Sequence, residues 1–67
     1  MFIHEAVSTA FAKGLFITRP QWRGRLKIKP TDTDHCCELH CKDRERIGLR
    51  WNPDALDLIA DDWQIVS

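Results

Sequence analysis

The first apolar pattern along the chain has the spacing of a helix. Four apolar side chains recur at intervals of three and four residues, namely Ile3, Val7, Ala10 and Phe11. This spacing places them on one helical face. Gly14 is a residue type that commonly follows the last turn of a helix. The pattern therefore predicts a helix from about residue 3 to residue 13.

The central part of the chain alternates in the manner of β-strands. Residues 15–18 are a β-rich run that ends before Pro20, and residues 21–24 have the composition of a turn. In residues 25–29, Leu26 and Ile28 point to one face and the basic side chains to the other. Residues 35–41 alternate again, after a loop at 30–34 and before a charged hairpin loop at 42–46.

The last third of the chain combines a short helix with strand-like flanks. Asn52 and Pro53 are favourable at the N-cap and first helical positions, so a helix is expected to follow them. Three apolar side chains then share one helical face, at Leu56, Ile59 and Ala60. Trp63 and Ile65 alternate around Gln64 as a closing strand does.

These elements predict a single α+β domain over residues 1–67. Its expected core is a small antiparallel sheet of three to five strands, with an N-terminal helix and a short helix before the last strand. A chain of 67 residues buries only a small core, which favours self-association as a dimer or tetramer. Three cysteines, no signal-peptide pattern and no long apolar run indicate a reducing cytoplasm and no membrane span.

Charge is distributed unevenly although the net charge is zero. Residues 1–30 carry six basic side chains and one acidic, whereas residues 31–67 carry nine acidic and four basic. The asymmetry indicates a first half that faces anions, or attraction between protomers. A net charge of zero argues against binding to long nucleic acid.

A tryptophan lies within the basic part of the chain. The candidate site there is a basic strip of Arg19, Trp22, Arg23 and Arg25, continued by Lys27 and Lys29. Guanidinium groups bind phosphates and an indole stacks on a nucleobase, so an anionic nucleotide is one interpretation. The other is a solvated strand face beside a core tryptophan. Trp51 precedes a helix start, where backbone amides attract anions, so it is interpreted either as a core residue or as a ligand contact. Trp63 is assigned to the core.

Metal binding and catalysis are both disfavoured by spacing. The sequence His35-Cys36-Cys37-x-x-His40-Cys41 resembles a zinc cluster, but in a strand Cys37 and Cys41 lie roughly 13 Å apart, too far to share one ion. No nucleophile is paired with a base, so the chain is not expected to be an enzyme. The adjacent carboxylates Asp61 and Asp62 are interpreted as solvated or as partners of a basic neighbour.

Several segments together resemble a known family. They are a Glu-Ala helix ending in Lys13-Gly14, a turn at 18–24 with Trp22 and Gly24, and the tail from Trp51 to Val66. This order resembles the Thoeris anti-defence family of the second type, small proteins of phages and prophages. Arg23 stands where that family usually has Asn or Asp.

The resemblance implies a non-catalytic sponge without a cofactor, in the cytoplasm of the infected or lysogenic bacterium. It would assemble as a homo-oligomer and trap a cyclic nucleotide signal, of the cyclic ADP-ribose type or a cyclic oligonucleotide. The resemblance also implies that Trp22 and Trp51 form the aromatic walls, with Arg19 and Asp57 at matched positions. Two alternatives stay open: a protein-interaction module using the acidic C-terminal helix, and weak binding to single-stranded nucleic acid.

Overall fold

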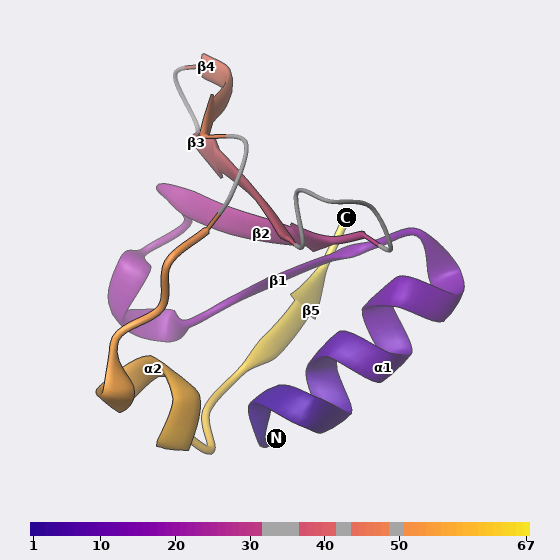
Figure 1. Cartoon of the computed structure of the whole chain (residues 1–67), viewed down its shortest axis with the longest axis vertical. Coiled ribbons are helices and arrows are strands. Elements are labelled where there is room, and N and C mark those ends of the chain that lie inside the picture. Colours follow the sequence, from indigo (N-terminus) through magenta and orange to yellow (C-terminus); the bar gives the residue numbers. More distant parts are fainter. Residues whose placement is uncertain (32–36, 42–43, 49–50) are drawn as a thin grey trace.

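The computed structural model describes residues 1–31, 37–41, 44–48 and 51–67, with only the backbone described at 44–48. The elements follow in the order α1 (Ile3–Lys13), β1 (Phe16–Thr18), a 3₁₀ turn η1 (Pro20–Trp22), β2 (Leu26–Pro30), β3 (Cys37–Cys41), β4 (Arg44–Gly48), α2 (Ala55–Ile59) and β5 (Gln64–Val66). The fold is therefore α+β, as the sequence predicts (Figure 1).

Helix α1 begins and ends where the sequence places it. No conventional capping residue precedes it, and the carboxylate of Glu5 instead accepts a hydrogen bond from the amide of Phe2 at 3.0 Å. Gly14 ends the helix in the left-handed conformation, with φ at 69°. That backbone conformation costs glycine least, because it has no Cβ.

The five described strands form one sheet in the order β4-β3-β2-β1-β5. All of its pairs are antiparallel, and Ile17 of β1 lies opposite both Ile28 of β2 and Ile65 of β5. Figure 1 shows α1 along one side of the sheet, and α2 beside the N-terminal end of α1. A main-chain hydrogen bond joins the N-terminus to the segment before β5: the amide of Trp63 donates to the carbonyl of Met1 at 3.1 Å.

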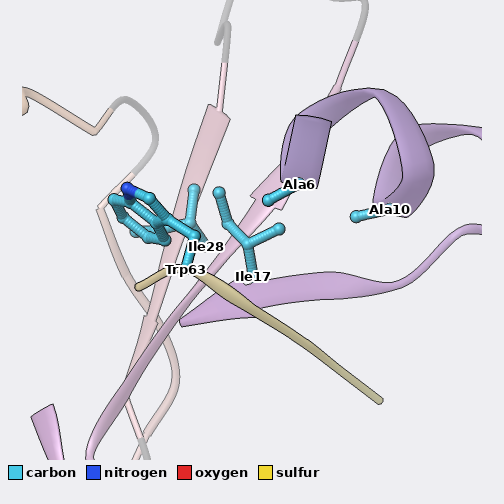
Figure 2. Packing of buried hydrophobic residues seen from close by; sticks show 5 residues of the cluster. All are labelled: Ala6, Ala10, Ile17, Ile28 and Trp63. Carbon is cyan, nitrogen blue, oxygen red and sulfur yellow. The ribbon is translucent and has the colours of Figure 1, made fainter. Parts of the chain in front are cut away.

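The core lies between α1 and the sheet. Its fully buried members are Ala6, Ala10, Ile17, Ile28 and Trp63 (Figure 2). The small side chains of the two alanines allow the helix to approach the isoleucines closely. The alternation of strand residues then turns the neighbours of Ile17 and Ile28 to the other side of the sheet, which we call the outer face.

Two boundaries in the second half of the chain differ from the sequence prediction. The N-cap of α2 is Asp54, not Asn52, and the amide of Asp54 donates to the carboxylate of Asp57 at 3.2 Å. The predicted loop at 42–46 is wrong for residues 44–46, which belong to β4. Charged residues are tolerated there because β4 is at the edge of the described sheet.

Helix α2 turns most of its apolar side chains outward. Leu56 is 72% exposed and Ile59 69%, whereas Ala60 is half-buried and packs against the core. The shared apolar face that the sequence shows is therefore largely uncovered within the described chain. Among the described residues, no helix has the length and apolar character needed to cross a membrane.

Candidate functional site

Arg19, one of the predicted site residues, forms ion pairs with two carboxylates of the protein itself. Its Nη1 contacts Asp57 Oδ1 at 2.9 Å and its Nε contacts Asp62 Oδ1 at 3.0 Å. Only 10% of the Arg19 side chain and 14% of the Asp57 side chain are exposed. The hydrogen bond to Asp62, supported by the one to Asp57, outweighs burial and raises the pKa of Arg19 above its ordinary value. The guanidinium is permanently charged and fixes α2 to the end of β1.

The carboxylate of Asp57 accepts hydrogen bonds both from its own helix and from Arg19. Its Oδ2 accepts the amide of Asp54, while Oδ1 accepts Arg19. Its carbonyl also accepts the indole N–H of Trp63 at 2.9 Å. One residue of α2 therefore connects the helix start, the buried cation and the core tryptophan.

The three tryptophans pack against one another, largely edge to face. Ring centroids are 5.3 Å apart for Trp22 and Trp63, 5.7 Å for Trp51 and Trp63, and 6.5 Å for Trp22 and Trp51. Their interplanar angles lie between 78° and 86°, a favoured arrangement for aromatic pairs. Trp63 is buried, as the sequence predicts, and Trp22 and Trp51 are half-buried. Both remain available in part to a molecule at the surface.

The bend after β1 is built by backbone geometry. The amide of Trp22 donates to the carbonyl of Arg19, and that of Arg25 to the carbonyl of Trp22. Arg23 has a φ of 53°, in the left-handed region, and Gly24 follows at 77°. Asn and Asp adopt this region more readily than most residues. This backbone conformation therefore suits Asn or Asp better than the arginine that the chain carries at position 23.

Arg23 and Arg25 are exposed on this bend. Arg25 borders a hollow of about 620 Å³ on the outer face, which we call the outer-face hollow. Its side walls include Phe16, Lys27, His40 and Val66. Of these four, only Lys27 belongs to the basic strip that the sequence indicates. No Asp or Glu among the described residues lines it. Its volume is within the range of small-molecule sites.

The register of the sheet explains how these wall residues meet. Phe16 of β1 lies opposite Val66 of β5, and Lys27 of β2 lies opposite His40 of β3. The ammonium of Lys27 lies 4.0 Å from the centre of the Phe16 ring, and the His40 ring meets that ring edge-on at 5.0 Å. Alternation along the sequence places Lys27 and Ile28 on opposite faces of the sheet, but it does not say which strands are neighbours. That is why the hollow was missed.

The Cys-His segment forms a strand where it is described. Cys37 and Cys41 both belong to strand β3, within the strand predicted at residues 35–41, and His40 binds Glu38 at 3.2 Å. His35 and Cys36 lie outside the described residues. Within the described ranges no group of three His, Cys, Asp or Glu is placed to hold a metal ion.

The fold and the hollow define a small α+β protein with a basic, aromatic surface cavity. Residues 1–66 match the sequence model of the Thoeris anti-defense 2-like (Tad2-like) domain. The chain belongs to the Thoeris anti-defense 2-like family, and this membership supports a phage anti-defence role. Comparisons with curated proteins and with solved structures gave no match.

Proposed function

We propose that this chain is a non-catalytic sponge that binds a cyclic nucleotide immune signal and holds it unaltered. The signal would be of the cyclic ADP-ribose type or a cyclic oligonucleotide. The observation that carries the proposal is the outer-face hollow beside the bend, with Arg25 and Lys27 on its border and no Asp or Glu among the described residues of its lining. Such a cavity favours an anion of nucleotide size, and family membership supplies the biological setting.

A sponge acts by stoichiometry, not by turnover. It lowers the free concentration of the signal only if it is abundant and its dissociation constant lies below the working concentration of that signal. The bend supports the required affinity, because Arg23 and Arg25 are exposed next to the half-buried indole of Trp22. Arg19 and Asp57 support it indirectly, by fixing α2 and the tryptophans behind the bend.

The binding test is a calorimetric titration of the purified protein with a panel of cyclic nucleotides. Arg25→Ala removes an exposed cation at the border of the hollow, and we expect it to weaken binding about 10-fold, as loss of a charged hydrogen bond does. Lys13→Ala is the matched control, since Lys13 is an exposed cation on α1, on the opposite side of the sheet. Equal affinities of the two variants would argue against the hollow as the site.

We also propose that the protein works as a homo-oligomer. Leu56 and Ile59 are exposed large apolar side chains on α2, and the core of the described chain is small. A second copy of the chain would cover them. We expect light scattering to give a dimer or tetramer, and Leu56→Ser combined with Ile59→Ser to shift it toward the monomer. An oligomer of the same mass in the wild type and the double variant would place the contact between protomers elsewhere. A monomeric wild type would refute the homo-oligomer.

A further inference from the structure

The outer-face hollow brings an aromatic ring and two cations together, and no tryptophan is among the residues that line it. The predicted aromatic walls, Trp22 and Trp51, have their rings engaged with each other and with Trp63 behind the bend. The rings that line the hollow belong to Phe16 and His40. A planar group bound in the hollow therefore meets a phenylalanine before it meets an indole.

The ring of Phe16 is flanked by cations. The ammonium of Lys27 lies 4.0 Å from its centroid and that of Lys29 lies 5.8 Å from it. Lys27 also donates to the main-chain oxygen of Ser67, the last residue of the sequence, at 3.2 Å. These two contacts are weak enough to exchange, because a cation–π contact at a partly exposed site contributes little and the lysine stem is flexible.

The charges in the hollow fit a phosphate close to the ring. Lys27 is on the strand that Arg25 precedes by one residue, and both line the same cavity. An anionic group between them gains a guanidinium fork and a mobile ammonium. A base attached to that group lies within reach of Phe16 and of the His40 ring that contacts Phe16 at 5.0 Å.

We propose that the outer-face hollow seats the base of an anionic nucleotide on Phe16, beside His40, and its phosphate between Lys27 and Arg25. On binding, the Lys27 ammonium leaves the Phe16 ring for the phosphate, so one movement uncovers the ring and supplies the charge. This inference rests on the proposed function, from which it takes the nucleotide nature of the ligand. It assigns the contact with the base to Phe16 of β1 and not to Trp22 of the bend.

The test uses two conservative variants and NMR of the full chain. Phe16→Leu removes the ring and Lys27→Met removes the charge while keeping the stem. We expect each to weaken binding of a cyclic dinucleotide about 10-fold. With inorganic pyrophosphate as the probe, we expect Lys27→Met alone to weaken binding. Lys13→Met is the control for charge loss, and dispersed amide spectra verify that each variant is folded.

Movement of Lys27 has its own signature. In the free protein we expect the ring current of Phe16 to displace the Lys27 ε-methylene proton signals upfield, since the ammonium lies over the ring. At saturation with the dinucleotide we expect that displacement to disappear, whereas in Phe16→Leu it is absent from the start. A displacement that persists at saturation, or unchanged affinities in Phe16→Leu and Lys27→Met, would overturn the assignment.

The failures of the two proposals are distinguishable. If the wild type binds no cyclic nucleotide, the sponge function fails and the inference falls with it. If the wild type binds tightly, Phe16→Leu and Lys27→Met bind equally well, and Trp22→Phe loses affinity, the function stands and the base belongs on the tryptophan bend. Loss in Phe16→Leu with full affinity in Trp22→Phe supports the hollow.

Discussion

Replacement of Trp63 by alanine is expected to abolish cooperative folding of this chain. Trp63 is 2% exposed, contacts the core isoleucines and both other tryptophans, and donates its indole N–H to the carbonyl of Asp57. Removal of a large aromatic side chain from a core costs about 3–5 kcal/mol. A chain of this length has a total stability of roughly 3–10 kcal/mol, so the loss is comparable with the whole.

The measurement is urea unfolding followed by far-ultraviolet circular dichroism at one fixed protein concentration. A fixed concentration matters because self-association raises apparent stability by mass action. Trp63→Phe, which keeps a ring, should retain a transition at lower urea. Phe11→Ala is the matched control, as Phe11 is 51% exposed, and its effect should stay below about 1 kcal/mol. A Trp63→Ala protein that unfolds like the wild type would show that the core lies elsewhere.

The second large effect is expected at Arg19. Arg19→Met leaves the carboxylates of Asp57 and Asp62 without their shared cation, and the Asp57 side chain is only 14% exposed. Loss of one partner from a buried ion pair costs about 3–5 kcal/mol. Asp62 is 44% exposed, and water solvates its carboxylate in part. We therefore expect Arg19→Met to lower the free energy of unfolding by about 2–3 kcal/mol.

Arg19→Lys and Lys13→Met make the test specific. Lysine keeps the charge but not the two-pronged geometry, so Arg19→Lys should fall between the wild type and Arg19→Met. Lys13→Met also deletes a cation, but on the exposed end of α1. The pKa of Arg19 is raised, so its guanidinium stays charged throughout the ordinary pH range. The stability that this charge contributes is lost as pH rises through the raised pKa. A free energy of unfolding for Arg19→Met within 0.5 kcal/mol of the wild type, about the scatter of neutral surface changes, would contradict the assigned role.

Much of the fold was predictable because its local signals agree with one another. The spacing from Ile3 to Phe11 and the glycine at 14 define α1, and alternation identifies β2 and β3. The start of α2 was misplaced by two residues, since Asn52 and Asp54 are both good caps. Asp57, three residues after Asp54, accepts the amide of Asp54 and thus favours the later cap.

The candidate site was predictable only in part, because long-range pairing decides it. The sequence identifies Arg19, Arg25 and Trp22 as a basic aromatic group and Asp62 as a candidate partner for a cation. It does not say that Arg19 pairs with carboxylates 38 and 43 residues away. Nor does it show that β1 lies between β2 and β5, the arrangement that brings Phe16, Lys27 and Val66 to one cavity.

The central claim is that the protein captures a cyclic nucleotide and releases it unchanged. The most direct measurement mixes purified protein with an equimolar cyclic nucleotide, removes unbound ligand by filtration, denatures the protein and weighs the released molecule by mass spectrometry. We predict retention with a fixed ratio of ligand to protomer and release at the original mass. A filtrate that contains all of the added nucleotide, or a released product of altered mass, would contradict the claim.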